Sequence, residues 1–136
     1  MKTEINFATK SDKQFWFTLD RHLSEEEYDN KIRDRRCYVL SVDGKKAGIL
    51  RYNLFWDNTP FCTLLYIDEE YQRTGCGTKL MERWESDMKS LGYGRLLVST
   101  QADEEAQHFY RKLGFIDCGA LLEPNQATEL FLGKNL

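Results

Sequence analysis

Apolar residues along this chain follow two spacings in turn, one typical of strands and one typical of helices. Alternation or short continuous apolar runs predict strands at residues 5–8, 37–42, 47–55, 61–67, 96–99, 116–122 and 128–132. Apolar residues three and four positions apart predict helices after Ser11, after Ser24, from Thr78 and after Asp103. The predicted order is strand, two helices, three strands, helix, strand, helix and two strands. We therefore expect an α/β (α+β) fold.

Polar residues and glycines mark where these elements begin and end. Ser11 and Ser24 each precede a Gln or Glu by three residues, which is the spacing of a capping box. Asp103 is the expected N-cap of the last helix, and Asp43-Gly44 predicts a tight hairpin. The third helix is expected to end at Gly92 and to bury an apolar stripe of Leu80, Met81, Trp84, Met88 and Leu91.

Length and composition are those of one ordinary globular domain. The chain has 136 residues, 30% charged and 41% hydrophobic, and predicts a single domain over residues 1–136. The formal net charge of −3 and the lack of a basic run argue against nucleic acid as the main partner. No apolar stretch has the length of a membrane span, and the first residues do not resemble a signal peptide. We expect a cytoplasmic protein with no membrane association.

The four cysteines do not form a metal-binding or disulfide pattern. None stands in a Cys-x-x-Cys pair, so neither a zinc site nor a disulfide framework is expected. Cys37, Cys62, Cys76 and Cys118 are expected to be buried or half-buried free thiols. Cys76 precedes a predicted helix, where a thiolate is favoured, and a thiol that reacts with alkylating agents is one interpretation. A small filler in the loop is the preferred interpretation.

Residues 71–80 combine the end of an apolar strand, a glycine-containing loop and a helix start. Free N–H groups and the helix dipole favour a negatively charged ligand at a helix N-terminus. Gly75 and Gly77 let the backbone come close because they carry no Cβ, and Arg73 adds a guanidinium suited to phosphate. The segment predicts a site for a phosphorylated ligand, and the alternative is a tight turn without one. It lacks the Gly-Lys-Ser/Thr ending of a nucleoside triphosphate loop and the third glycine of the dinucleotide fingerprint.

Two motifs together resemble the GNAT family of acyl-CoA-dependent N-acetyltransferases. The loop pattern Gln/Arg-x-x-Gly-x-Gly/Ala is matched by Gln72, Gly75 and Gly77, and a second signature is matched by Phe109-Tyr110 and then Leu-Gly-Phe at 113–115. The order of elements is similar from end to end. The resemblance implies a GNAT-like fold, with a mixed, mostly antiparallel sheet of about seven strands flanked by four helices. It also implies an enzyme that moves an acetyl group from acetyl-CoA to a primary amine. The acceptor is unidentified, is expected to be a small molecule, and would attack directly in a ternary complex.

The resemblance also indicates which residues hold acetyl-CoA. The pantetheine arm is expected along Tyr66, Ile67 and Asp68. The pyrophosphate is expected at Gln72, Arg73, Thr74, Gly75, Cys76, Gly77 and Thr78. Asp103 stands where the family often has Asn and is included as a cofactor contact, although an ionised carboxylate accepts hydrogen bonds and does not donate them. Tyr110 is also an expected cofactor contact.

For catalysis, Tyr110 is the expected general acid that protonates the coenzyme A thiolate. Its alternative is an aromatic core residue on the apolar side of a helix. Family members often carry a Glu in the strand before the loop, and residues 61–65 contain none. Glu69, next to the loop, and Asp57, at the end of the hairpin, are the remaining candidates for the general base. A water chain to bulk solvent could replace a side chain altogether.

The acceptor is expected between the early helices and the central hairpin. His22, Arg51, Asn53 and Trp56 are the predicted acceptor contacts, because aromatic rings and polar groups suit a small amine. The alternatives are the two faces of an ordinary strand for residues 51–56 and a surface position near a helix end for His22.

Two other functions stay open at this stage. One is a non-catalytic acyl-CoA-binding module or sensor with the same fold. The other is an α/β nucleotide-binding domain unrelated to acetyl transfer. No metal site is expected, and the exposed edges of an open sheet are compatible with a homodimer.

Overall fold

The computed structural model describes residues 1–136, and its elements follow the predicted order. The strands are β1 (Thr3–Phe7), β2 (Cys37–Val42), β3 (Lys45–Phe55), β4 (Thr59–Ile67), β5 (Arg95–Gln101), β6 (Ile116–Leu121) and β7 (Glu129–Asn135). The helices are α1 (Lys13–Leu19), α2 (Glu25–Arg33), α3 (Cys76–Ser90) and α4 (Ala106–Lys112), with short 3₁₀ helices η1 (Lys10–Asp12) and η2 (Glu69–Tyr71).

The strands form one seven-stranded sheet in the order β1-β2-β3-β4-β5-β7-β6. β1 with β2, β2 with β3, β5 with β7 and β7 with β6 pair antiparallel. β4 pairs with β5 in parallel, with Phe61 opposite Leu97 and Cys62 opposite Val98. The predicted mixed, mostly antiparallel sheet is therefore confirmed.

The chain divides into two compact units that share β3, β4 and α3. The first unit comprises Met1–Tyr52 and Leu64–Trp84, and the second comprises Asn53–Thr63 and Glu85–Leu136. A single domain over residues 1–136 stays a prediction.

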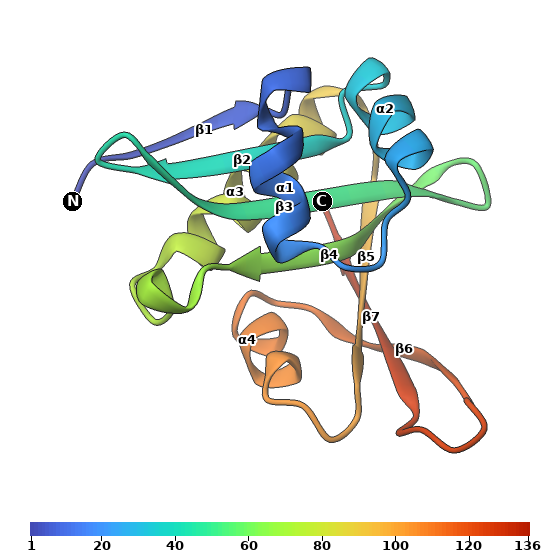
Figure 1. Ribbon diagram of the computed structural model, residues 1–136. Helices are drawn as coiled ribbons and strands as arrows, with labels where there is room; N and C mark the ends of the chain where they lie inside the picture. Colours follow the sequence, from blue (N-terminus) through green and yellow to red (C-terminus); the bar gives the residue numbers. More distant parts are fainter. The chain divides into compact units, whose positions relative to one another are not determined.

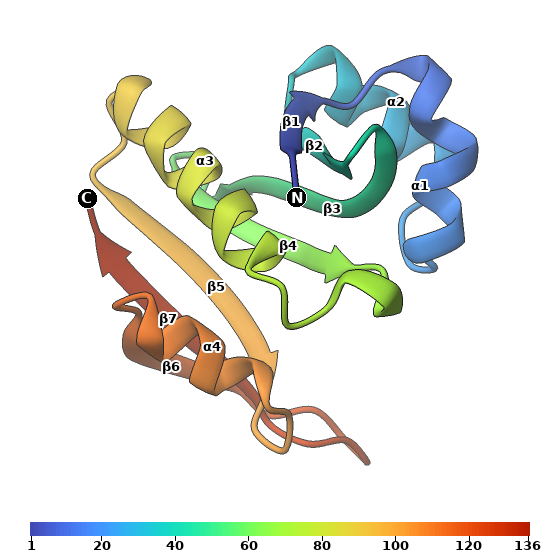
Figure 2. The same cartoon turned by 90° about the vertical axis from the view of Figure 1, so that its left-hand side faces the viewer.

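In the first unit, helices lie on both sides of β1, β2 and β3. Figure 1 and Figure 2 show α1 and α2 on one side and the first turns of α3 on the other. Trp16 of α1 and Tyr28 of α2 are completely buried, with ring centroids 5.4 Å apart. On the α3 side, the Trp84 and Tyr52 ring centroids are 5.8 Å apart. Because both faces are covered, β3 is buried without interruption over residues 47–52.

The second unit contains α4 and the strands β5, β7 and β6. Figure 2 shows α4 beside these strands, and α4 contacts β5 directly. The aromatic pairs Tyr110–Phe115 and Phe61–Phe131 have ring centroids 6.0 and 5.7 Å apart. β6 is the edge strand, and all its residues are exposed.

One of the two predicted capping boxes is wrong. Ser11 does not begin α1. The carboxylate of Asp12 accepts a hydrogen bond from the Thr9 N–H at 2.8 Å, and a 3₁₀ turn precedes the helix. The Asp12 carboxylate is held in place by Lys46, whose Nζ lies 2.6 Å away. The cap at Ser24 is confirmed, since its hydroxyl accepts from the N–H three residues later at 3.1 Å.

Three other residues differ from their predicted positions. Asp103 does not cap α4, because the chain first turns after β5 and the helix begins only at Ala106. Leu91 was expected to face the core, and it is 67% exposed because it directly precedes Gly92 (φ 92°), where the chain leaves the helix. Cys118 is exposed on the edge strand β6, whereas the other three cysteines are buried as predicted.

Candidate functional site

The glycine loop joins β4 to α3 in the first unit. Its backbone is left-handed at Arg73 (φ 63°), an exposed residue. Two side-chain hydrogen bonds fix its path. Gln72 Nε2 donates to the Ile67 carbonyl at 2.9 Å, and the Thr74 hydroxyl donates to the Tyr71 carbonyl. The loop is therefore tied to the chain segment just before it.

The N-terminus of α3 supplies N–H groups to this loop. The Lys79 N–H donates to the Gly75 carbonyl at 3.1 Å, so the amides of Cys76, Gly77 and Thr78 precede the helical hydrogen bonds. Gly75 has a φ of 87°, and a Cβ at this position would meet no atom within 4 Å. Open space, N–H donors and the loop's arginine together fit a phosphate or pyrophosphate group.

The Cys76 thiol is enclosed in the first turn of α3. The residue is 1% exposed, and the Thr74 hydroxyl lies 3.2 Å from its Sγ. This supports a filler role, because burial limits access of reagents to the sulfur.

Gly48 of β3 packs closely against the two elements that flank the loop, and the sequence motifs do not include it. A Cβ at Gly48 would lie 2.6 Å from Cδ1 of Ile67 and 3.4 Å from Cδ1 of Leu80. The glycine therefore lets the end of β4 and the start of α3, the two elements that flank the loop, approach β3. A glycine inside a strand pattern is the signal that could have identified it.

A hollow of about 320 Å³ lies next to the end of α1 in the first unit. It brings together His22 and Tyr66, two residues predicted for the site from separate segments. Both are exposed. The hollow is lined by Thr18, Leu19, Asp20, Arg21, His22, Leu64 and Tyr66.

Asp20, one of the residues that line this hollow, is buried, and both of its carboxylate oxygens accept hydrogen bonds within the protein. Its Oδ2 accepts hydrogen bonds from Arg51 Nε at 2.8 Å and Trp16 Nε1 at 3.0 Å. Its Oδ1 accepts from the backbone N–H groups of His22 and Leu23 at 3.0 and 3.2 Å. Burial raises the pKa of this carboxyl, but Arg51 and the other donors outweigh burial and hold the pKa below its usual value. Arg51, a predicted acceptor contact, is thus a buried partner of Asp20.

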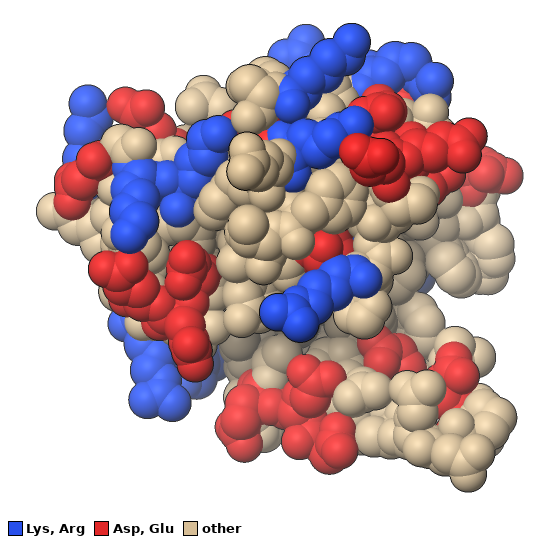
Figure 3. Space-filling model, viewed as in Figure 1, with Lys and Arg blue, Asp and Glu red and all other residues tan.

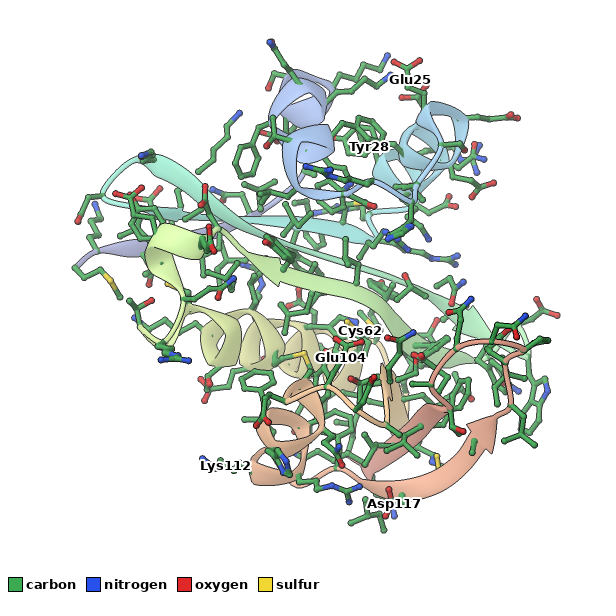
Figure 4. All side chains as sticks on the ribbon, turned by 60° about the horizontal axis from the view of Figure 1, so that its bottom comes forward. Glu25, Tyr28, Cys62, Glu104, Lys112 and Asp117 are labelled. Atoms are coloured by element: carbon green, nitrogen blue, oxygen red, sulfur yellow. The ribbon has the colours of Figure 1, made fainter.

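Tyr110 lies on α4 in the second unit. It is 7% exposed, and its ring packs against Phe109 and Phe115 with centroids 5.3 and 6.0 Å away. Burial, reinforced by Cys62 and Glu104 (labelled in Figure 4), raises the pKa of its phenol. The phenol is therefore protonated at neutral pH, and it is a weaker acid than an exposed tyrosine.

The hairpin between β3 and β4 places two predicted residues at its tip. Trp56 and Asp57 both have left-handed backbones (φ 56° and 64°), and the Asn58 N–H donates to the Phe55 carbonyl at 3.2 Å. This is a two-residue turn of type I′. Trp56 is 78% exposed, and its ring contacts Phe55 with centroids 4.8 Å apart. Asn53, on the strand leading to the turn, is also exposed.

The predicted site residues are divided between the units. The acetyl-CoA segments at 66–68 and 72–78, together with His22, Arg51 and Glu69, belong to the first unit. Glu69 is exposed on η2. The second unit contains Asn53, Trp56, Asp57, Asp103 and Tyr110.

The surface charges and the metal-binding residue types do not mark a further site on the protein. On the face drawn in Figure 3, acidic and basic side chains are interspersed and form no broad basic surface. No three His, Cys, Asp or Glu side chains gather in a way that could hold a metal ion. No helix is both long and apolar enough to cross a membrane.

Comparisons with known proteins agree with the motifs. Residues 5–115 match the acetyltransferase (GNAT) family. Spermidine N(1)-acetyltransferase of Escherichia coli (strain K12) is 34% identical over 103 residues, which cover 70% of this chain and 54% of that protein. The chain thus spans about half the length of the curated relatives it matches.

Two solved structures illustrate the shared fold. Ribosomal-protein-alanine N-acetyltransferase from Brucella melitensis has a TM-score of 0.85 at 18% identity, covering 98% of this chain and 99% of that chain. A GNAT family acetyltransferase from Elizabethkingia anophelis with acetyl-CoA bound has a TM-score of 0.77 at 17% identity, covering 98% of both chains. The resemblance predicted from the loop and the Tyr110 helix is confirmed, and the chain belongs to the GNAT acetyltransferase family.

Proposed function

We propose that this chain is an N-acetyltransferase that moves an acetyl group from acetyl-CoA to a primary amine of a small-molecule acceptor, which attacks directly in a ternary complex. Family membership supports the reaction class. The observation that carries the proposal is the glycine loop, with its open space and the N–H groups at the start of α3. The proposal includes a cytoplasmic location, and the exposed edge strand β6 is compatible with a homodimer.

Acetyl-CoA would be held by the two segments that follow each other at the end of β4. Residues 72–78 would bind the pyrophosphate through backbone N–H groups and the Arg73 guanidinium. Tyr66, Ile67 and Asp68 would lie along the pantetheine arm. Asp68 is fixed for this role by a hydrogen bond from its N–H to the Ala47 carbonyl at 2.7 Å. Asp103 is the further contact proposed in the second unit.

Tyr110 would return the proton to the leaving group. As the amine attacks the thioester carbonyl and the C–S bond breaks, the phenol O–H would protonate the thiolate, and solvent would then reprotonate the phenolate. A buried phenolate is unfavourable, so this transfer requires the thiolate to be held close and poorly solvated. A neutral, buried phenol is a suitable donor under those conditions.

The proton on the attacking ammonium would leave by one of three routes. Glu69 and Asp57 are both exposed carboxylates, so each could pass the proton to solvent. A water chain alone is the third route. The acceptor is left open, and spermidine is included because it is the substrate named for a relative.

Calorimetric titration tests the proposal first. We expect micromolar binding of acetyl-CoA and no binding of ATP or NAD. Thiol release with a panel of amines, spermidine among them, would then show turnover. Binding of acetyl-CoA without turnover of any amine would favour a non-catalytic acyl-CoA-binding module, an alternative favoured by the absence of a carboxylate from β4. No binding of acetyl-CoA would refute both.

A further inference from the structure

We propose that the hollow beside α1 binds a carboxylate of the acceptor, so that the preferred acceptors are amino acids or related amino carboxylates and not polyamines. The inference rests on the proposed function and deepens it. It depends on which charged side chains around the hollow are already paired within the protein and which face the space that an acceptor would occupy.

The hollow adjoins the segment proposed for the donor. Tyr66 is part of its wall and is also the first residue of the proposed pantetheine segment. Leu19 and Leu64 supply apolar wall and Tyr66 supplies a hydroxyl group, whereas the Thr18 hydroxyl already donates to the Phe15 carbonyl at 2.6 Å. A small acceptor held here would therefore lie next to the donor segment. The volume of about 320 Å³ is at the lower end for small-molecule pockets.

The one carboxylate of the hollow is not available to an ammonium group. Asp20 is 1% exposed, and both of its oxygens already accept two hydrogen bonds each. Its charge is balanced by Arg51 at 2.8 Å. An approaching ammonium would therefore meet neither an open acceptor nor an unbalanced negative charge on Asp20.

The remaining charge around the hollow is positive. Arg21 lines it and is exposed, and a guanidinium is cationic at any physiological pH. Its forked donors match the two oxygens of a carboxylate. His22, next in sequence, adds ring nitrogens to the same wall. With Asp20 neutralised, this set of groups suits an anion and disfavours a second ammonium of the kind that polyamines carry.

Matched acceptor pairs test the inference. Lysine with 1,5-diaminopentane and tyrosine with tyramine each differ by one carboxylate, and spermidine serves as the polyamine. We expect kcat/KM to be ~10-fold or more higher for the carboxylate member of each pair, the usual effect of one charge-assisted contact. Arg21→Ala should remove most of this preference and Arg21→Glu should reverse it. Lys89→Ala, which removes an exposed cation from α3, should leave it unchanged.

The possible results separate this inference from the proposed function. Equal or faster turnover of the decarboxylated amines or of spermidine would overturn the inference and leave the acetyltransferase intact. If no amine is turned over, binding decides. The His22 ring resonances should shift with lysine and not with 1,5-diaminopentane, and His108, exposed on α4, is an internal reference. Failure of the His22 signals to distinguish these two probes would overturn the inference.

Discussion

The guanidinium of Arg51 on β3 lies 2.8 Å from the carboxylate of Asp20 at the end of α1, and both residues are buried. This contact ties the loop after α1 to the sheet. The same carboxylate accepts hydrogen bonds from the backbone N–H groups of His22 and Leu23 in that loop. The wall of the hollow beside α1 therefore depends on the buried Asp20–Arg51 ion pair in the first unit.

Removing one member of this pair should destabilise the protein strongly. Arg51→Met leaves the Asp20 carboxylate buried without its counter-charge, and we expect the free energy of unfolding to fall by ~3–5 kcal/mol. Urea denaturation measures this change. The double variant Asp20→Asn/Arg51→Met should recover part of the loss, because no buried charge is then left unpaired. A double variant no more stable than Arg51→Met would contradict the charge argument.

Gly48→Ala should weaken acetyl-CoA binding. The added methyl group would lie 2.6 Å from Ile67 Cδ1 and 3.4 Å from Leu80 Cδ1 and the Tyr66 carbonyl oxygen, so the Ile67 side chain must turn away and repack beside the loop. We expect a loss of ~1–3 kcal/mol in stability, typical of overpacking, and an increased Kd for acetyl-CoA by calorimetry. Gly119→Ala is the matched control, because a Cβ on that strand glycine meets nothing within 4 Å. An unchanged Kd in the Gly48 variant would refute the positioning role.

Tyr110→Phe should reduce kcat and leave the affinity for acetyl-CoA nearly unchanged. Loss of a general acid typically lowers the rate by ~10²–10⁴-fold. Since burial raises the pKa of the phenol, its deprotonation should not limit the rate below about pH 9, given an ordinary phenol pKa of about 10. A pH–rate profile of the wild type, with Tyr93→Phe as the control variant, tests both points. Full activity in the Tyr110 variant would exclude the phenol as the acid.

Lys31 should make stability depend on alkaline pH. Its Nζ is buried and donates to the Tyr52 carbonyl at 3.0 Å, and burial lowers the pKa of the amine. The folded protein thus releases this proton at a lower pH than the unfolded chain, whose lysines titrate near about 10.4. Between the two pKa values Lys31 contributes a rise of the unfolding free energy with pH, by up to ~1.4 kcal/mol per unit, whereas the buried Cys37 thiol, whose pKa burial raises to about 12, contributes a fall above the ordinary thiol pKa.

Urea denaturation from pH 7 to 10 would measure this slope. Lys31→Met should lose the rise, and the exposed Lys89→Met should keep it. Identical slopes for all three proteins would show that the Lys31 amine keeps an ordinary pKa in the folded state.

Most elements were predictable because their signals are local. The Ser24 cap, the Asp43-Gly44 hairpin and the glycine that ends α3 each depend on neighbours within a few residues, and each is found in the structure. Leu91 was mispredicted because helical spacing says where a stripe continues and not where the backbone leaves the helix. Asp103 was mispredicted because a capping residue type does not show that the chain turns again before the helix begins at Ala106.

The charge of the hollow beside α1 depends on an ion pair between two residues that are far apart in sequence. Asp20 and Arg51 are separated by 31 positions, and only the packing of α1 on β3 brings them together. Arg51 was therefore predicted as an acceptor contact, since an arginine on a strand gives no sign of a buried partner. The loop at 72–78, in contrast, was recognisable because its glycines and helix start are contiguous in sequence.

The three tryptophans of this chain occupy two very different environments, and this has an optical consequence. Trp16 and Trp84 are completely buried, whereas Trp56 is 78% exposed at the hairpin tip. Acrylamide or iodide should quench the red-edge emission of Trp56 and spare the other two indoles. Intrinsic fluorescence thus contains a label-free reporter of that hairpin, and any acceptor that covers Trp56 should protect it from the quencher.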